Sequence, residues 1–213
     1  MSATEAGRRS GEAAEAALAA LVERTTGLQP GRRLFHACNG LLFAWLVAGS
    51  GWPRPWLVLL FGSAFVILLT VDALRLADPR LNVLFFRAFL RLASPREHEG
   101  LASSTWYVAG VLLTTALFPA GTAGPAILVL ALADPCASVI GRLWGRVKVG
   151  TGTLTGSAVF VVVATLVLSS RIPPGAALAC AVFVAVVEAL PWPLDDNLTI
   201  PLAAAGALQV VLG

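Results

Sequence analysis

The stretch LALADPCASVIGRLWGRVK at residues 130–148 contains the feature that decides the fold of this chain. It is an apolar run with one carboxylate, Asp134, and it changes directly into a basic segment. A second stretch, PLDDNLTIPL at 193–202, places Asp195 and Asp196 at the edge of another apolar segment. A carboxylate at membrane depth costs about 2.5 kcal/mol or more unless it meets a cation, a donor or water. Acids beside bases at a membrane face therefore predict a site for a metal ion and phosphates.

The composition of the whole chain is that of a membrane protein. Of its 213 residues, 57% are hydrophobic and 13% are charged, and the mean hydropathy is +0.82. We therefore predict an all-α, polytopic helical membrane protein with about seven transmembrane helices and short cytoplasmic and interfacial helices. The predicted spans are 35–50, 55–71, 101–118, 124–141, 154–170, 174–190 and 197–212. The predicted domains are a partly helical cytoplasmic segment, 1–33, and a transmembrane catalytic domain, 34–213.

The basic residues orient the chain in the membrane. Thirteen of the 15 Lys and Arg residues lie in the N-terminal segment and in the loops after the second and fourth predicted spans, whereas the opposite loops hold only Arg54 and Arg171. By the positive-inside rule, we expect a cytoplasmic N-terminus, an outside C-terminus and a site on the cytoplasmic face. Two helices outside the bilayer are predicted at 11–23 and 80–92. The second is either a helix in the headgroup plane, where a lipid substrate enters, or only a charged connector.

The spacing of charges and cysteines argues against nucleic-acid binding, a disulfide framework and a zinc site. The basic residues are spread over loops without a basic and aromatic platform, so nucleic-acid binding is not expected. Cys38, Cys136 and Cys180 are widely spaced and form no CxxC motif, which argues against a disulfide framework and against a zinc site.

The segment after Asp134 has the composition of a phosphate-binding loop. Its glycines make it pliable enough to wrap a ligand: Gly141, Gly145, Gly150 and Gly152. Its cations are suited to phosphate oxygens, which Arg binds bidentately and Lys as a point charge: Arg142, Arg146 and Lys148. The alternative is a basic loop that only follows the orientation rule and has flexible glycines.

Asp195, Asp196 and Asn197 offer three hard oxygen donors in a row. Such donors suit Mg²⁺ held jointly by carboxylates and substrate phosphates. Two adjacent like charges beside a bilayer also repel, which favours a cation near them. The alternative is a solvated turn that caps the last helix, although capping needs only one such residue.

Weaker candidates lie at the ends of other predicted spans. His36 follows Arg32 and Arg33 at the start of the first span and is either a catalyst or a hydrogen-bonded core residue. Asp72 and Arg75 stand one helical turn apart, as a structural ion pair or as a base with its positioning partner. The other acidic candidates are two residues of the loop before the third span and one near the end of the sixth: Glu97, Glu99 and Glu188.

Taken in order, these pieces resemble the dolichol kinase, phytol kinase and CTP-dependent diacylglycerol kinase family of polytopic membrane enzymes. The matching blocks cover most of the chain after residue 31: RRLFH at 32–36, DALRLADP at 72–79, REHEG and TWY within 96–107, ADPCASVIGRLWGRVK at 133–148, TLTGS at 153–157 and EALPWPLDDNLTIPL at 188–202. The block at 152–156 differs, because the family usually has a KS-x-EG pattern there and this chain lacks that Lys and Glu.

The resemblance implies transfer of the γ-phosphate of a nucleoside triphosphate, usually CTP, to the hydroxyl of a polyprenol, phytol or diacylglycerol, with Mg²⁺ as cofactor. The implied metal ligands are Asp134, Asp195 and Asp196. The implied catalytic residues are Asp72, Glu99, Asp134, Lys148 and Asp196, of which Asp72 or Glu99 would orient the lipid hydroxyl. The implied nucleotide-binding residues are His36, Arg75, Ser138, Gly141, Arg142, Arg146, Gly156 and Asn197.

Two other functions compete with this one. A phosphatidate cytidylyltransferase also uses CTP in a membrane, but the GHGG-x-x-DR-x-D type of signature is absent here. A transporter or scaffold would have carboxylates near the middle of the membrane in broken helices, whereas these acids are predicted at one face. The sequence leaves open the lipid alcohol, the nucleotide base and the oligomeric state.

Overall fold

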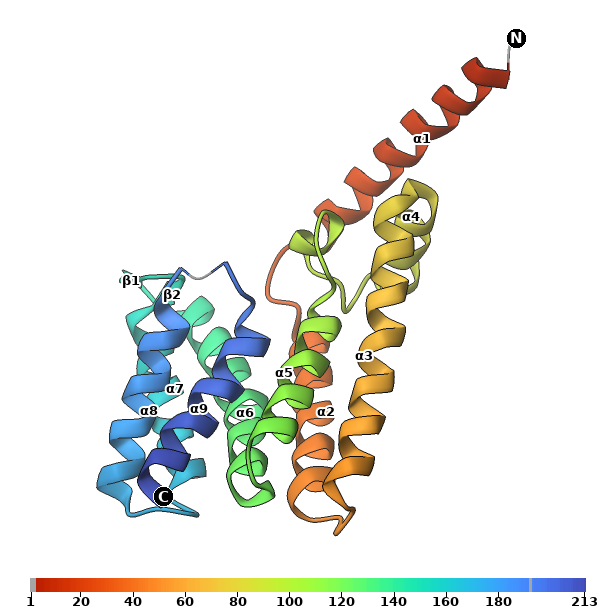
Figure 1. Cartoon of the computed structure of the whole chain (residues 1–213). Coiled ribbons are helices and arrows are strands. Elements are labelled where there is room, and N and C mark those ends of the chain that lie inside the picture. Colours follow the sequence, from red (N-terminus) through yellow and green to blue (C-terminus); the bar gives the residue numbers. More distant parts are fainter. Residues whose placement is uncertain (1–2, 192) are drawn as a thin grey trace.

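The computed structural model describes residues 3–191 and 193–213, with side chains from residue 13 onward, and it is a bundle of helices (Figure 1). The helices are α1 (Ala3–Arg24), α2 (Pro30–Ala48), α3 (Arg54–Ala77), α4 (Pro79–Ala88), the 3-10 helix η1 (Pro95–His98), α5 (Ser103–Leu117), α6 (Ala120–Trp144), α7 (Leu154–Leu168), α8 (Pro174–Ala189) and α9 (Asp196–Leu212). The strands β1 (Lys148–Val149) and β2 (Gly152–Thr153) form a small antiparallel hairpin between α6 and α7.

The helical class predicted from composition is confirmed. Each of the seven predicted spans corresponds to one helix, namely α2, α3 and α5 to α9. The two helices predicted outside the bilayer correspond to α1 and α4. The hairpin was not predicted. It turns at Gly150, whose φ of 53° lies in the left-handed region that glycine adopts without strain.

Two of the described helices are long and apolar enough to cross a membrane by length and composition, α3 with 24 residues and α6 with 25. Three more apolar helices are shorter, with 15 residues in α7, 16 in α8 and 17 in α9. A full span needs about 20 residues, so these three reach less far. The apolar helices indicate a membrane protein, while the number of spans stays a prediction.

Helix α6 lies at the centre of the bundle and packs against α2, α7 and α9. Ile127 and Leu130 of α6 are fully buried, as are Phe160 of α7 and Ile200 of α9. The outer helix faces, by contrast, expose large apolar side chains: Leu59, Val66, Ile67 and Leu74 on α3, and Val162 and Leu166 on α7. An exposed apolar surface of this extent suits contact with lipid.

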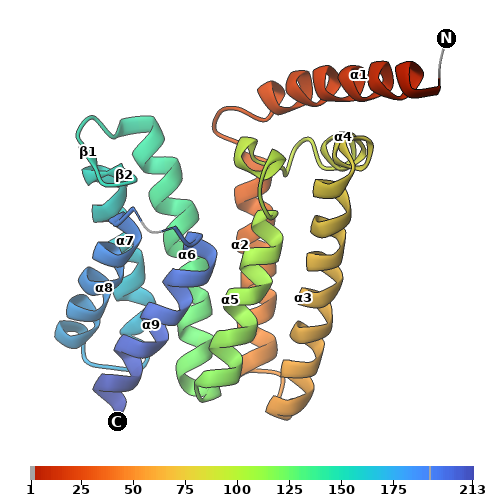
Figure 2. The same cartoon turned by 45° about the horizontal axis from the view of Figure 1, so that its top comes forward.

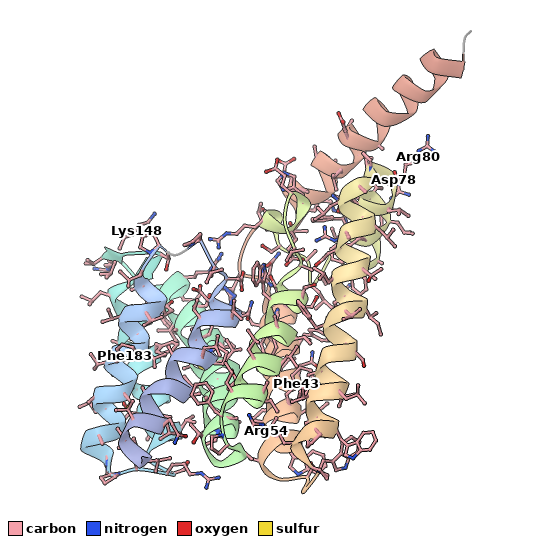
Figure 3. The ribbon with its side chains drawn as sticks, viewed as in Figure 1. Phe43, Arg54, Asp78, Arg80, Lys148 and Phe183 are labelled. Carbon is pink, nitrogen blue, oxygen red and sulfur yellow. The ribbon has the colours of Figure 1, made fainter. Side chains whose placement is uncertain are left out.

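Basic residues gather at one end of the bundle. Lys148 and Arg80 lie at the same end, and Arg54 lies at the other (Figure 3). Helix α1 runs across this same end, above α4 (Figure 2). We call it the basic end. This distribution agrees with the charge pattern of the sequence, and the orientation toward the cytoplasm stays a prediction.

Candidate active site

Four carboxylates from three helices converge near the basic end, and we call them the acidic cluster. Asp134 lies in the last three turns of α6, Glu188 at the end of α8, and Asp195 and Asp196 where α9 begins. Asp196 is within Coulombic range of the three other carboxylates. The Glu188 Oε2 atom is buried without a hydrogen-bond partner among the described residues. Because like charges within Coulombic range repel, the cluster is suited to bind cationic groups.

An arginine pair, Arg32 and Arg33 in the first turn of α2, faces the acidic cluster. Both guanidinium groups are within Coulombic range of Asp134. Arg33 also donates a hydrogen bond of 2.6 Å to Ser138 Oγ, one turn beyond Asp134 on α6. Its Nε atom is buried and has no partner in the described part of the chain. The pair places fixed positive charge beside the carboxylates, an arrangement that suits phosphate oxygens.

The start of α9 shows a helix cap within the Asp-Asp-Asn sequence, and metal binding there stays a prediction. Asp195 caps the helix, because its Oδ1 accepts bonds from the Asn197 backbone N–H at 3.0 Å and from Asn197 Nδ2 at 2.6 Å. Asp196 follows as the first helical residue and interacts with Asp134 and Glu188. One aspartate therefore has the capping role, and the amide of Asn197 serves this cap.

The glycines after Asp134 mainly permit close packing rather than wrapping a ligand. A Cβ atom at Gly141 would lie 2.7 Å from Thr153 Oγ1 and 3.2 Å from the Gly156 Cα atom, so both glycines let α6 approach α7. Arg142 donates to the Gly27 carbonyl oxygen at 2.9 Å and ties α6 to the linker before α2. Lys148 on β1 and Arg146 just before β1 are both exposed. Their binding of phosphate stays a prediction.

Asp72 and Arg75 form a buried and fully engaged ion pair, with exposed fractions of 1% and 2%. Arg75 Nε donates to Asp72 Oδ1 at 2.6 Å. The other guanidinium nitrogens donate to Asn82 Oδ1 and to the carbonyl oxygens of Glu97 and Gly100. Asp72 Oδ2 accepts bonds from the Ala102 backbone N–H and from Thr105 Oγ1. Of the two interpretations left open by the sequence, these contacts favour the structural ion pair.

The loop before α5 places Glu97 and not Glu99 toward the site. The side chain of Glu99 is 83% exposed and contacts the ring of His98 at 3.2 Å. Glu97 is 5% exposed, and its burial raises the pKa of its carboxyl group, against the opposing effects of Ser103 and Arg32. Its neighbour Arg96 is within Coulombic range of Asp196. The basic residues Arg32, Arg33 and Arg96 were not selected as site residues from sequence, although two adjacent arginines directly before an apolar run were a usable signal.

His36 packs within the bundle beside the arginine pair. Its ring lies 5.1 Å from that of Tyr107, whose hydroxyl donates to the His36 carbonyl oxygen at 3.2 Å. Arg32 and Arg33 are both within Coulombic range of the ring. The histidine therefore packs on Tyr107 next to the arginine pair, and a role in nucleotide binding stays a prediction.

The donor set fits a metal that is shared with a substrate. Among the described residues, no three His, Cys, Asp or Glu side chains are arranged to hold a metal ion by themselves. Mg²⁺ usually takes one or two carboxylates and completes its shell with water and substrate phosphates. Asp134 and Asp196, which interact across α6 and α9, supply carboxylates of this kind.

A close contact between α5 and α9 positions the start of α9, and Gly110 permits it. A Cβ atom at Gly110 would overlap the carbonyl oxygen of Asn197. We expect Gly110→Ala to push this segment away, to lower activity about tenfold or more and to destabilise the fold by about 1–3 kcal/mol. The matched control is Gly206→Ala on α9, which meets nothing within 4 Å. Thermal unfolding and the rate of the phosphoryl transfer predicted from sequence check both variants, and equal behaviour of the two would contradict the positioning role of this contact.

Fold and site together define a helical membrane protein with facing acidic and basic groups at one end of its bundle. No protein-family model and no solved structure matches the chain. The chain is 29% identical over 202 residues to CTP-dependent diacylglycerol kinase 1 of Schizosaccharomyces pombe, a match that covers 85% of this chain and 92% of that protein. It is 27% identical over 116 residues to the protein of the same name from Saccharomyces cerevisiae, covering 54% of this chain and 39% of that protein. The Eremothecium gossypii protein of that name is 28% identical over 116 residues, 54% of this chain and 36% of the relative. The predicted resemblance to the family that includes CTP-dependent diacylglycerol kinases is confirmed by these homologues.

Proposed function

We propose that this chain is a membrane lipid kinase that transfers the γ-phosphate of CTP to the hydroxyl group of a lipid alcohol. The observation that supports this function most directly is the meeting of the acidic cluster with the arginine pair at one end of an apolar bundle. The names of the homologues supply the nucleotide and the class of reaction. Phosphoryl transfer requires mainly positioning and charge neutralisation, which this combination of groups can provide.

The proposed roles follow from charge and position. Arg32 and Arg33 bind phosphate oxygens of CTP from the side of α2, and Arg142, Arg146 and Lys148 add positive charge from α6 and the hairpin. Asp134, Asp195 and Asp196 are the residues that would hold Mg²⁺. When bound, the metal ion would neutralise charge on the phosphate oxygens. The lipid hydroxyl oxygen attacks the γ-phosphorus, the bond to the β–γ bridging oxygen breaks, the hydroxyl proton passes to a carboxylate of the acidic cluster, and CDP leaves.

The lipid is proposed to reach this site from the bilayer. Diacylglycerol is the first candidate because three homologues are named for it, and polyprenol or phytol is the second because of the motif resemblance. The exposed apolar faces of the bundle allow a lipid to approach laterally. We further propose that the basic end faces the cytoplasm, where CTP is available, in line with the distribution of basic residues.

Labelled CTP separates this function from nucleotidyl transfer. We expect purified protein in lipid vesicles to move label from γ-labelled CTP into a lipid monophosphate and to release CDP, because attack occurs at the γ-phosphorus. Thin-layer separation of the lipids, with diacylglycerol, polyprenol and phytol offered one at a time, identifies the acceptor. The control is α-labelled CTP, which should leave the lipid fraction unlabelled. Label that enters lipid only from the α position would instead establish a cytidylyltransferase.

A further inference from the structure

Glu97 is a buried carboxylate at the edge of the candidate site that has no role in the proposed reaction. It lies in η1 and is 5% exposed. Ser103 is the first residue of α5, and its hydroxyl group donates a hydrogen bond of 2.8 Å to Glu97 Oε1. Arg32 NH2 lies 2.5 Å from Ser103 Oγ and 3.9 Å from Glu97 Oε1. The three side chains thus form a chain from η1 through α5 to α2.

The direction of these hydrogen bonds is fixed by chemistry. A guanidinium group only donates and an ionised carboxylate only accepts, so the Ser103 hydroxyl must donate to Glu97 and accept from Arg32. The donor-only guanidinium group of Arg32 and the acceptor Oε1 of Glu97 together determine which way the serine hydroxyl points. Gln29 Oε1 adds a second acceptor for Arg32, at 3.3 Å. The guanidinium group is accordingly oriented by two neutral acceptors and one nearby negative charge.

The buried Asp72–Arg75 pair holds the segment that presents Glu97 and Ser103 through three hydrogen bonds to its backbone. Arg75 donates to the Glu97 carbonyl oxygen at 2.6 Å and to the Gly100 carbonyl oxygen at 2.7 Å. Asp72 accepts the backbone N–H of Ala102 at 2.9 Å. These bonds lie directly beside both residues that orient Arg32. The buried pair thereby defines where the guanidinium group of Arg32 lies.

Asp134 also attracts Arg32. Both groups are within Coulombic range, so an unrestrained arginine would move toward the acidic cluster and neutralise it. We infer that Glu97 and Ser103 are positioning residues that hold Arg32 beside the acidic cluster, with its guanidinium group available to the phosphates of CTP. This inference rests on the proposed function. It gives Glu97 a role in addition to helix capping and core packing.

Glu97→Gln is the sharpest test, because glutamine keeps the shape and an acceptor oxygen and removes only the charge. We expect the KM for CTP to rise about tenfold while kcat changes less than about twofold, since only ground-state placement of Arg32 is lost. Ser103→Ala should give the same split. In an Arg32→Ala background, Glu97→Gln should have no further effect, because its action passes through Arg32. The matched control is Thr122→Val, which removes a buried 3.0 Å bond to Gln209 at the opposite end of the bundle and should leave the KM unchanged.

The outcomes separate this inference from the proposed function. Wild-type protein that moves no γ-label into lipid would overturn the kinase assignment, and the positioning role is then decided by equilibrium binding of labelled CTP. Binding about tenfold weaker in Glu97→Gln supports the role, and unchanged binding overturns it. An undiminished effect of Glu97→Gln in the Arg32→Ala background also overturns it. If Glu97→Gln does not fold, Ser103→Ala decides the same comparison.

Discussion

Replacing Asp196 by Asn is expected to lower kcat/KM for lipid phosphorylation on the order of 100-fold or more, with little change in thermal stability. The residue interacts with three other carboxylates, so its charge serves the cluster's affinity for cations. Removing one of four repelling charges also relieves strain on the fold, which is why stability should be preserved. Initial rates with γ-labelled CTP over a range of Mg²⁺ concentrations measure the loss, and thermal unfolding measures the stability.

Two aspartates provide matched comparisons. Asp195→Asn removes a cluster charge but keeps the helix cap, because Asn caps as well as Asp. Asp78→Asn makes the same change at another helix cap, that of α4, whose contact is with the Arg80 backbone N–H at 2.8 Å. We expect loss of activity in the first and wild-type activity in the second. Full activity of both Asp195→Asn and Asp196→Asn at low Mg²⁺ would remove these two residues from the site.

Replacing Arg75 by Met is expected to destabilise the protein by about 3–5 kcal/mol, because it leaves the buried Asp72 carboxylate without its counter-charge. The change also releases the Glu97 and Gly100 carbonyl oxygens that Arg75 holds. Thermal or denaturant unfolding in vesicles or detergent provides the measurement. Lipid kinase activity at a temperature where the variant is folded should fall as well, since the segment before α5 is no longer fixed.

The exposed Arg87 on α4 offers the control for this change. Arg87→Met should alter stability by less than about 0.5 kcal/mol, because a surface side chain has no buried partner. The double variant Asp72→Leu with Arg75→Met should cost less than the two single changes together, since no lone charge remains. Strictly additive losses would show that the ion pair is not the cause.

The sequence predicted the helices well because apolar runs and prolines determine them locally. The predicted span 124–141 is contained in α6, and Pro30, Pro79 and Pro174 occupy the first positions of α2, α4 and α8. The prediction ended the second span at 71, before the first charges, whereas α3 continues to Ala77. Asp72 and Arg75 neutralise each other within the fold, and only tertiary structure can show that two charges do so.

The site was predicted only in part, for a related reason. Asp134, Asp195 and Asp196 stood out because acids beside apolar segments are rare, and the fold brings them together. Of the two acids in the loop before α5, the sequence prediction selected Glu99, whereas the fold buries Glu97 and exposes Glu99. Two neighbouring acids in a loop do not indicate which side of a short 3-10 helix will be buried. Similarly, Gly141 was predicted to belong to a pliable loop and Gly156 to bind the nucleotide, and in the fold both glycines permit close packing of α6 against α7.

The unequal lengths of the helices have a consequence for the surrounding bilayer. At 1.5 Å per residue, the 24 residues of α3 extend about 36 Å and the 15 residues of α7 about 22 Å. If both helices contact the same bilayer, its hydrocarbon layer of about 30 Å matches neither, and lipid must thin along the α7 side. Such thinning draws headgroups down toward the end of α8 and the start of α9. A lipid hydroxyl would then meet the carboxylates without leaving its own leaflet, so membrane thickness itself becomes a determinant of the reaction rate.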